Sequence, residues 1–269
     1  MKKRKSNIKE LIFIGVLALL LAAGDLFAFP ASLFVNISLA DINPIYFTIM
    51  VNQWLLIGLG LIAVNFLCPS LHLGLGKDGL KNGIKKYALS GGILFVVSLG
   101  AFALGLIGSY NYTPTVWKVL IEGFVYYISV AFIEELYVRG LLLNFLERLL
   151  KSKRNATMIA IIVSSLIFSL GHIPGMIGQG ALTIVCRLIW TSMLGIFLGV
   201  TYKKTNNLWI PIALHTVIDF CGAPFCFTST IAYPAVSVVV IAVAYVLVGS
   251  WSICDFAKRK EVNSNGEKA

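Results

Sequence analysis

The stretch Phe132-Ile-Glu-Glu-Leu-Tyr-Val-Arg-Gly140 determines how the rest of the chain is interpreted, because it places two adjacent acids inside a long apolar run. A charged side chain near the middle of a bilayer costs about 3 kcal/mol on insertion scales, so an acid pair there indicates a functional site. Glu135 and Arg139 have the i,i+4 spacing and order that favour an ion pair on one helix. Glu134 points about 140° away from Arg139, at roughly 100° per residue. We therefore expect Glu134 to find its partner on another helix and to be the reactive acid.

The composition predicts an all-α membrane protein. Apolar residue types make up 58% of the 269 residues, charged types make up 13%, and the mean hydropathy is +0.87. A soluble domain is about half apolar and about a quarter charged. The net charge of +10 does not indicate a nucleic-acid partner, because the basic residues gather in short loops between apolar spans. The five cysteines are odd in number and lack zinc-binding spacing, which argues against a disulfide framework.

The apolar segments predict a polytopic transmembrane helical bundle of about eight spans. It forms one domain over residues 1–253, with the motif-bearing core at about 115–222 and a basic tail at 254–269, because no linker or internal repeat divides the chain. The predicted spans are 11–40, 44–68, 87–108, 115–150, 156–171, 180–202, 208–220 and 231–253. The run 115–150 exceeds the ~20 residues of a simple span, so its second part is expected to project from the bilayer or bend along its surface. The segment 71–86 is expected to lie amphipathically on the surface.

The basic residues also predict the topology. They concentrate at the N-terminus, in the connections 71–86, 148–154 and 203–204, and in the tail, whereas the intervening connections hold one Lys and no Arg. The positive-inside rule then places both termini in the cytoplasm, with eight spans alternating between the two sides. The first apolar run is longer than the ~7–15-residue core of a secretory signal, which favours a first span over a cleaved signal. We expect a multi-pass protein of a cell membrane, of bacterial origin.

Two histidines each lie four residues from another notable side chain, a helical spacing that makes them candidates for one site. Phe168-x-x-x-His172 and His215-x-x-x-Asp219 each put two side chains on one helix face. Either histidine alone is more often a hydrogen-bonded residue of the helix packing than a catalytic group. Arg187 is another charge within a predicted span, and we expect it to have a structural role, paired with Asp219 or with a backbone carbonyl.

Helix geometry tests whether these residues can meet. In an antiparallel hairpin that turns at Lys153, Glu134 and His172 reach the same level, about 28 Å from the turn. His215 lies only about 12 Å from its own turn near Asn207. The three residues therefore meet only if the first hairpin projects ~15 Å further than the second, which predicts a cavity that opens to the cytoplasm.

Taken in order, the motifs resemble those of a known family. The chain resembles the CAAX-processing and bacteriocin-processing (CPBP, or Abi) intramembrane proteases, which include the eukaryotic Ras-converting CAAX endopeptidase. The residues that carry the resemblance are Glu134-Glu135-x-x-x-Arg139, Phe168-x-x-x-His172, and His215-x-x-x-Asp219 preceded by Asn207-Leu-Trp-x-Pro. The resemblance covers about residues 134–219. It implies a glutamate-dependent endopeptidase that needs no metal or other cofactor and acts on a membrane-associated, in some cases lipidated, peptide or protein.

The resemblance also implies roles for individual residues. Glu134 would be the general base and His172 its partner in activating water. His215 and the residue four positions later would stabilise the oxyanion. Glu135, Arg139 and Phe168 would support them. The family commonly has Asn at that last position, whereas this chain has Asp219. Because an anionic Asp is a poor oxyanion donor, Asp219 is expected to orient His215 or to be protonated.

Several other functions compete with the endopeptidase. The main alternative is a non-catalytic membrane protein of the same fold, such as a bacteriocin self-immunity factor or a regulatory partner of a sensor kinase, and Asp219 is the feature that favours it. A zinc site made of Glu134, His172 and His215 is less favoured, because the chain lacks the His-x-x-x-His spacing of metalloprotease helices. A transporter is least favoured, because no repeated halves are found.

Overall fold

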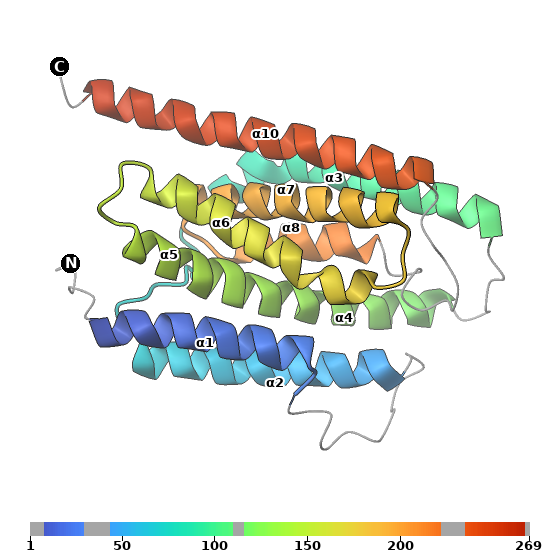
Figure 1. The fold of residues 1–269 in the computed structure, drawn as a ribbon, viewed down its shortest axis with the longest axis horizontal. Coiled ribbons are helices and arrows are strands. Elements are labelled where there is room, and N and C mark those ends of the chain that lie inside the picture. Colours follow the sequence, from blue (N-terminus) through green and yellow to red (C-terminus); the bar gives the residue numbers. More distant parts are fainter. Residues whose placement is uncertain (1–7, 30–43, 110–115, 222–234, 267–269) are drawn as a thin grey trace.

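The computed structural model describes residues 8–29, 44–109, 116–221 and 235–266, and within these ranges it is a helical bundle without strands (Figure 1). The predicted all-α, multi-span fold is thereby confirmed. The helices in chain order are α1 Ile8–Leu26, α2 Pro44–Leu67, α3 Leu80–Ser109, α4 Val116–Glu135, the π-helix η2 Leu136–Leu143, α5 Asn144–Leu149, α6 Ala156–Gly171, the 3₁₀ turn η3 Ile173–Met176, α7 Ala181–Thr205, α8 Trp209–Phe220 and α10 Ala235–Gly266.

The bundle has the polarity expected of a protein surrounded by lipid. Large apolar side chains face outward, as Phe66 and Leu89 do at 75% and 77% exposure, while charged side chains such as Arg139 are fully buried. Among the described residues, three helices are long and apolar enough to cross a membrane, namely Tyr46–Leu67, Ala181–Thr205 and Ala235–Lys258. The shorter helices α6 and α8 are also apolar. Burial of charge under an apolar exterior agrees with a bilayer environment.

Two predicted segments differ from the structure. The first predicted span was expected to reach residue 40, but α1 ends at Leu26 and is followed by a turn, and residues 30–43 lie outside the described part. The segment 71–86 was expected to lie amphipathically on the surface, but Leu71 and Leu73 are buried in the core, and a helix begins only at Leu80. Apolar side chains in a loop can pack inward as well as those of a helix.

The helices pack in layers, and the helices from the middle of the chain form the central layer. The rod formed by α4, η2 and α5 lies with α6, α7 and α8 in the centre, α1 and α2 pack on one side, and α3 and α10 pack on the other (Figure 1). α10 continues without a break through residue 254, where the basic tail was expected to begin. The motif-bearing helices are therefore held between two helical pairs that carry no motif.

The long rod changes its helical type immediately after the acid pair. Backbone angles at Glu135 and Asn144 are helical, so α4 passes through η2 into α5 without a break. The wider π turn alters the carbonyl ladder, and the Asn144 side chain donates hydrogen bonds to the Arg139 and Gly140 carbonyls at 3.1 and 2.9 Å. π-helical turns occur frequently at functional sites. This one begins one residue after Glu135.

A loop between α2 and α3 closes the basic end of the bundle. Asn207, fully buried between α7 and α8, donates hydrogen bonds to the carbonyls of Gly76 and Asp78 at 2.7 and 2.9 Å. Gly74 has φ +74°, and an added Cβ would lie 2.1 Å from the Asn206 carbonyl oxygen. Only glycine allows so close an approach in that conformation. The asparagine of the Asn-Leu-Trp motif thus ties this loop to the central helices.

Candidate active site

His215, on α8, is the centre of the candidate site and is only 2% exposed. Its Nδ1 lies 2.8 Å from Glu135 Oε1. Because an ionised carboxylate only accepts hydrogen bonds, Nδ1 carries the hydrogen and donates it. The other ring nitrogen, Nε2, lies 3.2 Å from Asp219 Oδ2 and 3.5 Å from Glu134 Oε2. The ring is therefore fixed with Nε2 facing two carboxylates.

Glu135 and Arg139 form the predicted ion pair on one helix. Arg139 Nη1 donates to Glu135 Oε1 at 2.7 Å, and both side chains are fully buried. Arg139 also donates to the Gly195 carbonyl at 3.2 Å and lies over the Phe168 ring at 4.9 Å. The guanidinium thus fixes Glu135, which in turn fixes His215. Glu135 is thus neutralised on its own helix, as its sequence position predicted, and both contacts use Oε1, while its Oε2 is buried without a hydrogen bond within the described residues.

Glu134 points away from that ion pair. Its side chain is 13% exposed, and within the described residues its Oε2 atom is buried without a hydrogen bond. Glu134 Oε2 lies 3.5 Å from His215 Nε2, on another helix, as expected from the helix period. A buried carboxylate oxygen without a donor is costly. Such an oxygen is well suited to receive a proton from a bound water.

His172 lies at the end of α6 and does not contact Glu134 directly. Its Nδ1 donates to the Phe168 carbonyl at 2.9 Å, which leaves Nε2 as an acceptor. The Phe168 ring packs edge-on against His172 and His215, with centroids 4.7 and 5.9 Å away. No hydrogen bond joins the two histidines in the described part of the chain. Phe168 thus spaces the two imidazoles, and a molecule shared by His172 and Glu134 would have to lie between them.

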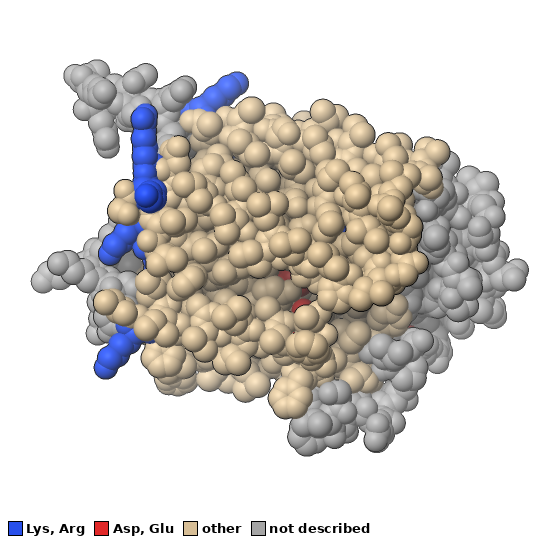
Figure 2. Space-filling model, viewed as in Figure 1, with Lys and Arg blue, Asp and Glu red and all other residues tan. Residues whose placement is uncertain are grey.

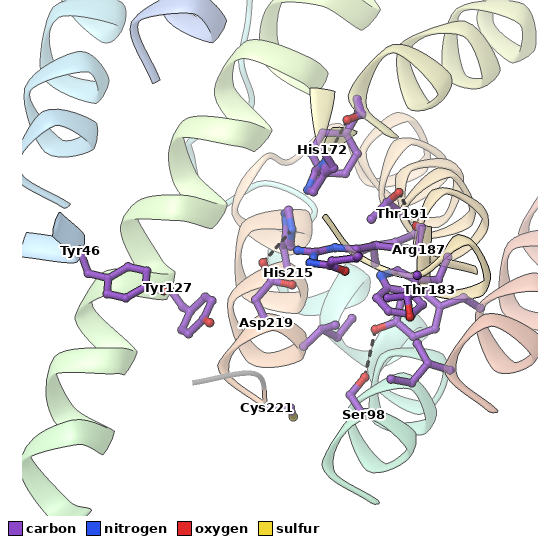
Figure 3. Close-up of a pocket in the computed structure, with 18 of the residues that line it drawn as sticks. Tyr46, Ser98, Tyr127, His172, Thr183, Arg187, Thr191, His215, Asp219 and Cys221 are labelled. Carbon is purple, nitrogen blue, oxygen red and sulfur yellow. Dashed lines mark hydrogen bonds and ion pairs between the residues drawn. The ribbon is translucent and has the colours of Figure 1, made fainter. Parts of the chain in front are cut away.

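A cavity of about 690 Å³ adjoins these residues (Figure 3). Its lining includes His172, His215 and Asp219 but not Glu134, which lies behind His215 and Asp219, and the cavity reaches the exposed connection 178–180 between η3 and α7. Figure 2 shows acidic atoms in a hollow near the middle of one face, whereas Lys and Arg gather at the left end. The cavity was expected to open at the basic end of the bundle, but it extends toward the connection at the opposite end.

The helix lengths explain the direction of the cavity. α6 and α8 are short, with 16 and 12 residues, and both end on the side of the 178–180 connection. Their neighbours continue past these ends, so the interior is left unfilled there. At the basic end, by contrast, the docked loop and a cluster of polar contacts close the bundle. In that cluster, Lys203 donates to Asn144 and Glu147, at 2.6 Å in each case.

Arg187 enters the cavity from α7, on the side facing His215 and Asp219 (Figure 3). Its expected pairing with Asp219 or with a carbonyl is not found, because no hydrogen bond or ion pair of its guanidinium occurs with the described residues. Arg187 is partly exposed to the cavity. In the sequence, Arg187 was recognisable only as a charge within a predicted span.

A divalent cation has one potential site among the described residues. Ligand atoms of Glu134, His215 and Asp219 lie within 4.8 Å of one another, and these residue types bind such ions. The considered zinc site contained His172 in place of Asp219, so the residues that converge are not the expected set.

Other polar groups near the site gave weak signals in the sequence. Asp25, an acid without a visible partner in the sequence, accepts a hydrogen bond from Gln53 at 3.0 Å, and Gln53 accepts one from Ser129 at 2.7 Å. In the sequence, the members of this network were recognisable only as isolated polar residues within apolar runs.

Comparison with known proteins identifies the same part of the chain. Residues 116–221 match the family model described as type II CAAX prenyl endopeptidase Rce1-like. The match covers less than half of the chain and includes all three motifs. Among curated proteins, none matches the chain.

Proposed function

We propose that this membrane protein, whose residues 116–221 match the family model of Rce1-like type II CAAX prenyl endopeptidases, is an intramembrane endopeptidase with Glu134 as general base. The observation that carries the proposal is the buried Glu134 Oε2, which lacks a hydrogen bond within the described residues and faces His215 Nε2 at 3.5 Å. A general base must have an open oxygen within reach of the water it activates. Its substrate would be a membrane-associated peptide or protein.

The proposed reaction begins with a water molecule held between Glu134 and His172. As the water oxygen bonds to the scissile carbonyl carbon, Glu134 takes one of its protons, and the carbonyl oxygen becomes an oxyanion. The C–N bond then breaks, and the proton held by Glu134 passes to the leaving amine. The products are an amine and a carboxylic acid, and the acid then loses the second water proton to solvent and becomes a carboxylate. His172 contributes its free Nε2 lone pair, which accepts the second hydrogen of the water and orients it.

Asp219 has a positioning role in this proposal. Its Oδ2 lies 3.2 Å from His215 Nε2, so it adjoins the ring nitrogen that also faces Glu134. A carboxylate cannot donate a hydrogen bond to an oxyanion unless it is protonated. We therefore assign Asp219 to holding His215 in place, in agreement with the first of the two roles expected for it.

Substitution of Glu134 by Gln tests the mechanism. Gln keeps the size of the side chain but cannot accept a proton, so peptide termini created by the protein should disappear, with at least a 100-fold loss of turnover. Mass spectrometry of membrane-protein termini should compare cells with the wild-type chain, the variant and no chain. A matched control is Glu122→Gln, an acid of the same helix outside the motifs. Identical termini in wild-type and Glu134→Gln cells would favour the non-catalytic alternative.

Removal of metal ions with a chelator tests whether Glu134 acts as a base without a bound metal. Turnover of a substrate found in that comparison should survive 1,10-phenanthroline, because the proposed reaction uses only side chains and water. Reversible loss of turnover that added zinc restores would instead assign the chemistry to an ion at Glu134, His215 and Asp219. Binding of zinc without an effect of the chelator on turnover would leave the glutamate mechanism intact.

A further inference from the structure

Arg187 is a charge without a described partner inside the bundle. It lines the cavity together with His172, His215 and Asp219, and no contact within the described residues satisfies its guanidinium. A charge within a membrane span carries a cost of a few kcal/mol, and such residues mark functional sites by default. A guanidinium has five N–H donors and stays protonated in proteins, so it is suited to bind an anion.

The helix contacts place Arg187 at the level of His172. Ser169 on α6 and Thr191 on α7 share a hydrogen bond of 2.8 Å, and these two helices run antiparallel. His172 lies three residues beyond Ser169, and Arg187 lies four residues before Thr191. At 1.5 Å per residue, both are displaced from this contact by about 4.5–6 Å toward the same end of the bundle. The guanidinium and the imidazole therefore border the same part of the cavity.

The proposed peptidase needs a donor that the three motifs do not supply. His215 Nδ1–H is used by Glu135, His215 Nε2 is held by the Asp219 carboxylate at 3.2 Å, and His172 Nδ1–H is used by the Phe168 carbonyl. Glu134 and Asp219 are acceptors when ionised. Among the motif side chains that face the cavity, no N–H group remains free in the described structure. The oxyanion formed from the scissile carbonyl must therefore be stabilised by another residue.

We propose that Arg187 is the oxyanion donor and thus a catalytic residue outside the three motifs. This inference rests on the proposed peptidase function. When water adds to the scissile carbonyl and Glu134 takes the proton, the carbonyl oxygen gains the negative charge, and guanidinium N–H groups donate hydrogen bonds to it. Arg187 keeps its protons throughout. Collapse of the intermediate returns the electron pair to the carbonyl and expels the amine, which receives the proton from Glu134.

In the same proposal, the cationic Arg187 is the counterpart of Asp219 across the cavity. An amide at that position could itself donate to an oxyanion, whereas the carboxylate cannot when ionised. Arg187 and residue 219 should therefore be coupled in the reaction. Loss of Arg187 should be more harmful next to Asp219 than next to an Asn, which supplies a replacement donor.

Purified variants measured on a substrate identified with the Glu134→Gln comparison test this role. Arg187→Gln should lower kcat by about 100–1,000-fold with KM changed less than threefold, since loss of one oxyanion donor has effects of this size. Arg187→Lys, which retains the charge, should keep more kcat than Gln. Thr183→Val, another lining residue of α7, is the matched control and should stay within about twofold. In the Asp219→Asn background, Arg187→Gln should lose at least tenfold less kcat than in the wild-type background.

Each outcome separates this inference from the peptidase proposal. Wild-type kcat in a folded Arg187→Gln variant, or a loss confined to KM, would overturn the oxyanion role. Equal losses in the two residue-219 backgrounds would also overturn it. If Arg187→Gln fails to fold, the Lys variant and its coupling to residue 219 decide the question. If Glu134→Gln retains turnover, the glutamate mechanism itself fails, whatever Arg187 does.

Discussion

At the scale of single residues, the site depends on a chain of buried contacts that each fix the next. Arg139 fixes Glu135, and Glu135 accepts the Nδ1 hydrogen of His215. The second ring nitrogen of His215 is thereby directed at Glu134 and Asp219. A hydrogen bond to one imidazole nitrogen determines which nitrogen is available for chemistry. Adjacent acids with similar sequence surroundings thus have different contacts: Glu135 pairs with Arg139, whereas Glu134 faces His215 on another helix.

Substitution of Glu135 by Gln should therefore reduce stability more than chemistry. The change leaves the fully buried Arg139 without its anion, and removal of one member of a buried pair costs about 3–5 kcal/mol. We expect Glu135→Gln to lower the free energy of unfolding by roughly 3 kcal/mol, measured by unfolding in mixed detergent micelles. The double variant with Arg139→Gln should lose less than the two single losses added together. Wild-type stability of Glu135→Gln would contradict the role assigned to this pair.

Much of this residue-level arrangement follows from the helix period. The i,i+4 pairing of Glu135 with Arg139 and the interhelical partner of Glu134 were predictable, because both depend only on angles along one helix. The direction of the cavity was not, since it depends on where α6 and α8 end within the bundle. The partners of Asn207 were also hidden, because they lie about 130 residues away in the chain.

At the scale of helices, small residues allow α6 and α7 to pack closely. A Cβ added to Gly195 would lie 2.8 Å from the Ser165 Cβ, which is closer than real side chains approach. The Gly195 carbonyl also accepts a hydrogen bond from Arg139. Membrane helices commonly use small residues at such contacts. The distance between α6 and α7 in turn determines the width of the cavity between His172 and Arg187.

Substitution of Gly195 by Ala should separate these two helices. The added methyl group must displace Ser165, and overpacking of this kind costs about 1–3 kcal/mol. The melting temperature in detergent should fall, and Ser165→Gly in the same chain should recover part of the loss by removing the opposing Cβ. Gly92→Ala is the matched control, because its added Cβ would meet no atom within 4 Å. An unchanged melting temperature for Gly195→Ala would show that the helices can move apart freely.

At the scale of the whole molecule, the basic residues gather at one end, whereas the cavity extends from the middle toward the other. The basic connections close one end of the bundle, and the cavity reaches the connection 178–180 near the other (Figures 1 and 2). If the basic end is cytoplasmic, as the positive-inside rule predicts, the cavity opens toward the other side of the membrane. A substrate would then reach the site from that side or from within the bilayer.

Single-cysteine labelling tests this orientation. Ser152 and Gln179 are exposed at opposite ends of the bundle, and each can be changed to Cys in a chain whose native cysteines, including the exposed Cys254, have been replaced. An impermeant thiol reagent should label Gln179→Cys in intact cells and Ser152→Cys only after the cells are opened. The opposite result would invert the topology and return the cavity to the cytoplasmic side.

The loop docked on Asn207 also has a consequence for biosynthesis. Asn207 is translated 131 residues after Gly76, whose carbonyl it binds. At about 5–20 residues per second, the ribosome needs roughly 10 s to make that interval. During this time the loop after α2 lacks the side chain that later closes it. The N-terminal half of the nascent chain can therefore reach its final arrangement only after α7 and α8 have been synthesised.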